Sequence, residues 1–349
     1  MALGAVAEPP VRRRGSDYAQ LSRRISQAGL LERRPGWYVT RIVLTLGAFV
    51  AGWVGVFLVG DSWWQLALAA VMAVATTQVA FLGHDAGHRQ MFRRRGPSEL
   101  VGLSAGNLAV GLSYGWWVDK HNRHHANPNH EDEDPDVGAG ALVWTPEQAM
   151  ETTGVNRWLA KRQAYFFFPM LLLEGLSLHV ASIRAIVGRE NGSYSTPMRH
   201  RAVEAALLVA HTVGYVVLLL AVMSPVKALL FAVVHQALWG LYMGCAFAPN
   251  HKGMPMPTAE DELDFLRKQV LTSRNVRGSR LVDTALGGLN YQIEHHLFPN
   301  MPRANLRRAQ PIVRAYCVEQ GISYAETGLV ESYRQALGHL HEVGRPLRG

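Results

Sequence analysis

The 349-residue sequence predicts an all-α, polytopic membrane protein with four transmembrane helices in two hairpins and a helical cap at the cytoplasmic surface. Charged residues make up 18% of the chain, below the roughly 25% that is usual for soluble domains. Apolar residues gather in four blocks, 42–59, 63–83, 203–223 and 226–248. Each block is close to the roughly 20 residues that span a bilayer, and the inner part of each carries no charge.

Short joints and the placement of basic residues predict how these blocks are arranged. Residues 60–62 join the first two blocks, and Ser224 and Pro225 join the last two, so each pair is expected to form a hairpin. Of the 35 Lys and Arg residues, only Lys227 lies at a joint. Because basic residues are retained in the cytoplasm, both termini and all segments outside the joints are predicted to be cytoplasmic.

The first 36 residues are predicted to form a basic N-terminal arm. Seven arginines lie there, namely Arg12, Arg13, Arg14, Arg23, Arg24, Arg33 and Arg34, without the apolar core of a cleavable signal peptide. The arm either lies on the anionic membrane surface or is a solvated tail. We expect one membrane domain over residues 37–314 and a cytoplasmic C-terminal tail over 315–349.

Two further apolar segments are predicted to remain at the membrane surface or to re-enter it. The segment 165–187 contains Glu174, His179 and Arg184. A charged group at the centre of a bilayer costs about 2.5–3.5 kcal/mol on the insertion scale, so a full crossing is disfavoured. The segment 100–114 is rich in glycine and too short to cross easily.

The histidines indicate the chemistry, because Cys245 and Cys317 are the only two cysteines and cannot form a four-cysteine zinc site or iron–sulfur cluster. Three clusters stand out among the 15 histidines: His84 and His88; His121, His124 and His125; and Gln292, His295 and His296. Spacings of three and four residues place the side chains of each cluster on one helical face. The predicted topology returns all three clusters to the cytoplasmic surface, where they can converge.

The number of imidazoles predicts two metal ions. Seven exceed the needs of one tetrahedral zinc, and neutral nitrogen ligands suit iron. We therefore expect a histidine-rich diiron centre in the cap.

The three clusters resemble the histidine boxes of the integral-membrane fatty acid desaturases. The matching segments are His84-Asp85-Ala86-Gly87-His88, His121-Asn122-Arg123-His124-His125 and Gln292-Ile293-Glu294-His295-His296. The resemblance covers roughly residues 39–314. The last box begins with Gln and is followed by Leu297-Phe298-Pro299, which is similar to the front-end and linoleoyl-CoA branch. Many front-end members carry a fused cytochrome b5 domain, whereas this sequence has no His-Pro-Gly-Gly haem motif.

The resemblance implies an O2-dependent oxidoreductase that introduces a double bond into a fatty acyl chain carried on CoA, a carrier protein or a lipid. Two Fe ions would supply the oxidant, and water would be the other product. The sequence has no flavin or dinucleotide fingerprint, so a separate electron donor is expected, such as an acidic ferredoxin or cytochrome b5 with its reductase. Membrane lipids are expected partners, and nucleic acid is not.

The resemblance also extends the set of candidate ligands. Family members take a ligand from a histidine beyond the boxes, near the cytoplasmic end of the fourth spanning helix, and His251 matches that position. Gln292 replaces a histidine of other branches and would ligate, bind through water or orient a neighbour. The carboxylates expected to orient ligating histidines are Asp85, Asp134, Asp136 and Glu294. The isolated His179, His211 and His235 are interpreted as packed or substrate-lining residues.

Four other functions compete with acyl desaturation. A hydroxylase or ketolase of the same superfamily would share the histidine boxes. A membrane b-type cytochrome would place histidine pairs inside facing helices, not at helix ends. A zinc protease of the His-Glu-x-x-His type would need a glutamate where this chain has Asp85. A metal transporter would line its crossings with polar ligands, and these blocks are nearly free of them.

Overall fold

A computed structural model describes residues 16–188 and 198–348, which are mostly helical. Residues 1–15, including Arg12, Arg13 and Arg14 of the predicted arm, lie outside the described residues. Two short strands, β1 (Asn275–Val276) and β2 (Glu326–Thr327), pair in parallel with Asn275 opposite Glu326. The prediction of a mainly α-helical chain is thereby confirmed.

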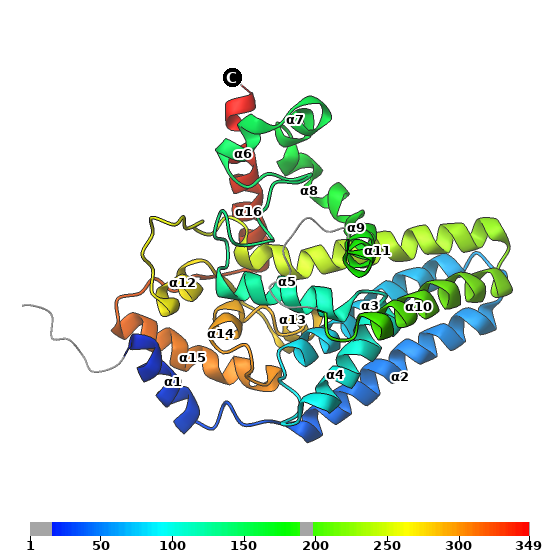
Figure 1. Cartoon of the computed structure of the whole chain (residues 1–349), viewed down its shortest axis with the longest axis horizontal. Coiled ribbons are helices and arrows are strands. Elements are labelled where there is room, and N and C mark those ends of the chain that lie inside the picture. Colours follow the sequence, from blue (N-terminus) through cyan, green and yellow to red (C-terminus); the bar gives the residue numbers. More distant parts are fainter. Residues whose placement is uncertain (1–15, 189–197, 349) are drawn as a thin grey trace, which may run out of the picture.

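Four helices are long and apolar enough to cross a membrane: α2 (Pro35–Val59), α3 (Gln65–Gly87), α10 (Arg201–Val222) and α11 (Pro225–His251). They cover all or most of each of the four apolar blocks predicted from the sequence. In Figure 1 they extend together to the right of the view. Outward-facing apolar side chains such as Leu58, which is 79% exposed, suit a lipid environment.

α3 lies at the centre of this group and packs against both α2 and α11. α11 contacts α10 less and instead packs closely on α9 (Glu174–Val187). Gly175 and Gly240 face one another at this crossing, and a Cβ on Gly240 would collide with the backbone nitrogen of Gly175. The two glycines therefore let α9 approach α11 closely beside the histidine clusters.

The segment 165–187 folds as two helices, α8 (Gln163–Leu171) and α9, which are bent by 70° at their junction. The segment 100–114 continues α4 (Arg95–Leu103) into a π-helix, η1 (Ser104–Val110), which ends at Gly111 with φ 82°. The rings of His179 and His211 donate to the carbonyl oxygens of Gly111 and Leu108, each at 2.9 Å. These bonds satisfy carbonyls that the end of the π-helix leaves without a partner.

A second lobe, at the left of Figure 1, carries the third histidine cluster. It contains α1 (Asp17–Gln27), α12 (Phe265–Leu271), α13 (Arg280–Ala285), α14 (Gln292–Leu297) and α15 (Arg303–Glu319). Leu21 and Ile25 of α1 are fully buried against α14 and α15. Burying each such side chain stabilises the fold by about 1.5–3 kcal/mol, so this part of the predicted arm belongs to the packed lobe.

The C-terminal segment is likewise packed. The boundary expected at residue 314 falls inside α15, and α16 (Leu329–Val343) packs on α8 and α11. The remaining short helices, α6 (Pro146–Glu151), α7 (Gly154–Ala160) and η2 (Arg345–Leu347), lie with α16 at the top of Figure 1. Leu340 and Val343 of α16 are almost fully buried, so this part of the predicted C-terminal tail is a packed helix.

Candidate metal centre

The histidines lie on four helix segments whose ends meet. The last turn of α3 carries His84, and His88 caps that helix. The second cluster lies on α5 (Tyr114–Ala126), whose first turn is capped by Ser113, with its Oγ 3.2 Å from the backbone nitrogen of Trp116. The third cluster lies on α14, and His251 ends α11.

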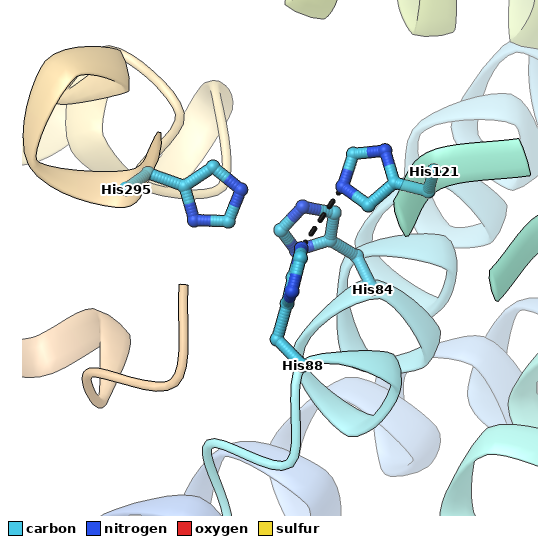
Figure 2. Close-up of side chains that lie close together, drawn as sticks. All are labelled: His84, His88, His121 and His295. Atoms are coloured by element: carbon cyan, nitrogen blue, oxygen red, sulfur yellow. Dashed lines mark hydrogen bonds between the residues drawn. The ribbon is translucent and has the colours of Figure 1, made fainter. Parts of the chain in front are cut away.

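The first group consists of His84, His88, His121 and His295, each of which offers a ring nitrogen within 4.8 Å of the others. Figure 2 shows these rings converging, with His295 approaching from the side opposite His121. Nε2 of His88 lies 2.9 Å from Nε2 of His121. Two neutral imidazoles this close, nitrogen to nitrogen, are geometrically suited to share one cation.

The second group consists of His124, His251 and His296, again within 4.8 Å of one another. Nε2 of His251 lies 3.1 Å from Nε2 of His296 and 2.9 Å from Nε2 of Gln292. His125 lies between the two groups. Its ring centroid is 4.6 Å from that of His88 and 4.1 Å from that of His296. All eight candidate histidines and Gln292 are thus brought together.

Four of the histidines have an acceptor at Nδ1. These pairs are His84 with Asp85 Oδ1 (3.3 Å), His124 with Asp134 Oδ2 (2.9 Å), His251 with the carbonyl of Thr272 (3.0 Å) and His296 with Gln269 Oε1 (2.9 Å). A proton held at Nδ1 leaves the Nε2 lone pair free to bind a metal. Asp85 and Asp134 were candidates from the sequence. Thr272 and Gln269 were not, because nothing in their local sequence marks them.

The two other candidate carboxylates lie differently. Asp136 Oδ2 is 3.5 Å from Nδ1 of His124, and Asp136 also forms an ion pair with Lys120. Glu294 instead accepts hydrogen bonds from Asn275 Nδ2 at 2.7 Å and Tyr324 OH at 2.8 Å. It therefore holds α14 against β1 and orients the third cluster through the backbone, not by contact with a ring.

Burial keeps five of these imidazoles neutral. It lowers the pKa of His88, His121, His125, His295 and His296 well below the ordinary value for histidine, and the neighbouring imidazoles lower it further. A neutral imidazole is the form that ligates a metal. These rings therefore keep their lone pairs available for a metal ion.

Unsatisfied ring nitrogens provide a direct test of whether the residues fit a metal. Among the described residues, His84 Nε2, His125 Nδ1 and both ring nitrogens of His295 are buried without a hydrogen-bond partner. Each such group costs about 1–3 kcal/mol when left unpaired. A bound metal ion would satisfy Nε2 of His84 and one ring nitrogen of His295, and a set of neutral nitrogen donors without thiolates suits iron. The residues fit a metal centre.

An apolar cavity opens beside the histidines. It has a volume of about 140 Å³, and His121, His124, His251 and Gln292 form one wall. Its other walls include Leu112, Trp117, Leu178, Met243 and Phe247. A second cavity of about 40 Å³ shares Leu112, Trp117, Met243 and Phe247 with it and reaches His84. A flexible apolar ligand would therefore lie in contact with both histidine groups.

The profile of the fatty acid desaturase family matches residues 61–328. The chain is 32% identical over 285 residues to an acyl-lipid (9-3)-desaturase of the moss Physcomitrium patens, which covers 80% of this chain and 53% of that protein. It is 29% identical to a delta(8)-fatty-acid desaturase of Euglena gracilis, covering 88% of this chain and 74% of that one. A delta(6)-fatty-acid desaturase of Caenorhabditis elegans is 28% identical, with 95% and 75% covered.

The chain thus spans about half the length of the moss relative and about three quarters of the other two. The family match covers all three histidine clusters and His251, and it extends over most of the chain. Together with the metal-binding geometry of those residues, it shows that the chain belongs to the fatty acid desaturase family.

Proposed function

We propose that this chain is an O2-dependent fatty acyl desaturase that introduces a cis double bond with a histidine-ligated diiron centre. The observation that carries the proposal is the arrangement of two buried histidine groups along the wall of an apolar cavity. The named relatives act on fatty acids. An acyl chain lying against Leu112, Met243 and Phe247 would place a methylene pair beside the centre.

Two iron ions would supply the oxidant for unactivated C–H bonds, a task for which protein side chains have no suitable chemistry. His84, His88, His121 and His295 would hold one ion. His124, His251 and His296 would hold the other, with Gln292 beside it and His125 between the two. The rings would be fixed by hydrogen bonds that their Nδ1–H groups donate to Asp85, Asp134, Gln269 and Thr272.

The rest of the chain would orient the substrate and keep water away from it. An acyl chain against the apolar part of the cavity wall would displace water from it, which would favour capture of hydrogen from the acyl chain over side reactions. Lys120, Asp136 and Glu174 also line the cavity, so it has a polar side next to the second histidine group. A polar end of the substrate would be accommodated on this side.

We further propose that the termini and the metal centre face the cytoplasm, and that electrons come from a separate acidic ferredoxin or cytochrome b5 with its reductase. All but one of the 35 Lys and Arg residues lie away from the helix joints, which supports both proposals. The acyl group would arrive on CoA, a carrier protein or a membrane lipid.

The decisive experiment for the activity is a fatty-acid profile of host cells that express the chain with a ferredoxin and its reductase. Gas chromatography–mass spectrometry with double-bond location should reveal a new cis alkene. His296→Ala should abolish the product, whereas His341→Ala, on α16, should retain it. A new hydroxy acid would move the chain to the hydroxylase branch, and an alkene made equally by His296→Ala would contradict the proposal.

A further inference from the structure

We propose that Arg303 is a positioning residue for the first histidine group and acts on His84 through Asp85. The inference rests on the metal-binding role proposed above. Arg303 is the first residue of α15, in the segment that follows the third histidine cluster, and it carries none of the candidate ligand atoms. Its side chain is nevertheless only 8% exposed, although it is a full positive charge.

The contacts of Arg303 explain this burial. Its Nε lies 2.7 Å, and its Nη2 2.5 Å, from Oδ2 of Asp85. Nη2 also donates to the carbonyl oxygen of Phe81 at 2.8 Å. Both partners belong to α3, so one guanidinium is fixed to the last turns of the helix that carries His84. Two charge-assisted bonds to one oxygen define the position of that carboxylate closely.

The carboxylate divides its two oxygens between two partners. Oδ2 faces Arg303, and Oδ1 lies 3.3 Å from Nδ1 of His84. Asp85 is 1% exposed, so water does not compete for either oxygen. Since Oδ2 is held, Oδ1 stays directed at His84 and the proton stays on Nδ1. Nε2 of His84, which has no hydrogen-bond partner, is then left free to bind the ion of the first histidine group.

The surroundings hold Arg303 itself in place. Its backbone nitrogen donates to Tyr38 OH at 3.1 Å, and Tyr38 donates to Gln90 Oε1 at 2.8 Å. Gln90 Nε2 in turn donates to the carbonyl oxygen of Pro299 at 2.9 Å. A Cβ on Gly288, where φ is +78°, would lie 2.6 Å from Cγ of Arg303, so this glycine leaves the space for the side chain.

This frame links the first cluster to the third. His84 belongs to α3 and His295 to α14, and their ring centroids are 4.8 Å apart within the first histidine group. Arg303 follows α14 in the chain and binds α3 beside His84. It therefore fixes the two clusters relative to one another as well as the orientation of one ring.

Metal binding tests the inference without relying on turnover. Purified protein in detergent would be titrated anaerobically with Co²⁺, and the d–d absorption would report each bound ion. Arg303→Gln should lower the affinity for one of the two ions by about 10–100-fold, the usual effect of losing a residue that orients a ligand. The affinity for the other ion should not change. The affinity of Arg303→Lys should lie between those of the wild type and Arg303→Gln, because one bond from the lysine ammonium group can replace part of the two guanidinium bonds to Asp85. Arg307→Gln, on the same helix and paired with Asp283 at the surface, is the matched control and should bind as the wild type does.

A double-mutant cycle tests whether Arg303 acts through Asp85. Asp85→Asn and Asp85→Asn/Arg303→Gln should lower the Co²⁺ affinity by the same factor, because Arg303 cannot influence His84 once the carboxylate between them is gone. Wild-type affinity in Arg303→Gln, or losses that add in the double variant, would overturn the inference while the diiron proposal stands. If Arg303→Gln fails to fold, unchanged binding by Arg303→Lys would overturn it. A wild-type protein that binds no metal would overturn both.

Discussion

Hydrogen bonds from Nδ1 fix the ring orientation of four of the buried histidines and leave their Nε2 atoms free to bind a metal. Asp85 and Asp134 could be predicted as acceptors because they lie within or just after a histidine cluster, so the chain itself brings them close. Gln269 and Thr272 could not, since tertiary packing brings Gln269 of α12 to His296 of α14 and brings Thr272, at the end of α12, to His251 of α11. Sequence spacing thus predicts which rings share a face but not the partners that tertiary packing adds.

Asp134 allows this account to be tested at the residue scale. Its Oδ2 accepts from His124 Nδ1 at 2.9 Å and from the backbone nitrogen of Asn129 at 2.7 Å. Asp134→Asn would remove the charge and one good acceptor, so we expect iron affinity to fall roughly 10–100-fold. Competition with a chelator, followed by iron analysis, measures this. Asp132→Asn, in the exposed part of the same loop, should bind iron as the wild type does. Equal affinities in the two variants would contradict the role of Asp134.

Helix ends, more than helix interiors, build the centre. α3 and α11 continue a few residues beyond the predicted apolar blocks and thereby carry His84 and His251 into position. The helical spacing of His84 and His88 predicted the first extension. What stabilises the second could not be predicted, because the cap of α11 comes from a distant part of the chain.

That cap is Arg274, which is 1% exposed. Its guanidinium donates to the carbonyl oxygens of Pro249, at 2.8 Å from Nη2, and Lys252, at 2.9 Å, on either side of His251. A positive charge at a helix C-terminus is favourable, and the carbonyls are buried, so the arginine stabilises both the helix end and the position of His251.

Arg274→Ala should cost about 2 kcal/mol or more of unfolding free energy, because it leaves buried carbonyls without donors. The apparent Tm in detergent should fall by several degrees, and iron content should fall with it. Arg277→Ala, whose side chain is 67% exposed and 4.0 Å from Glu326, is the control and should leave Tm within error of the wild type. An unchanged Tm for Arg274→Ala would show that this cap does not stabilise α11.

The π-helix η1 illustrates where local sequence is insufficient. Its segment was expected to be a surface or re-entrant piece, because it is short and rich in glycine. Its actual geometry depends on His179 from α9 and His211 from α10, which donate to its last carbonyls. No pattern within residues 100–114 contains that information.

At the scale of the whole molecule, the sequence predicted the four apolar helices and the convergence of the three clusters, but not the packing of the C-terminal helix α16 on α8 and α11. Charge content and hydropathy identify segments that favour lipid, and they do not report contacts among polar segments. α16 was expected to belong to a tail, yet Tyr333 OH donates to the carbonyl oxygen of Cys245 on α11 at 2.6 Å. Such contacts join segments far apart in sequence, which local patterns cannot register.

The proposed membrane orientation predicts which positions are reachable from outside the cell. Asp61, in the joint after α2, has a side chain 49% exposed, and Arg314, on α15, is 59% exposed. In intact cells a membrane-impermeant maleimide should label Asp61→Cys and should label Arg314→Cys only after permeabilisation. The wild type, with Cys245 partly buried and Cys317 buried, provides the background. The reverse pattern would place the metal centre on the outer side.

The central claim is that the two histidine groups hold two iron ions. Iron quantification with Mössbauer spectroscopy on the purified, folded protein tests it most directly, with His124→Ala as the companion variant. We predict two iron ions per chain with the signature of a coupled pair, and a loss of bound iron in the variant, since His124 belongs to the second group. A single iron per chain in folded, fully loaded wild-type protein, or full iron content in His124→Ala, would contradict the account.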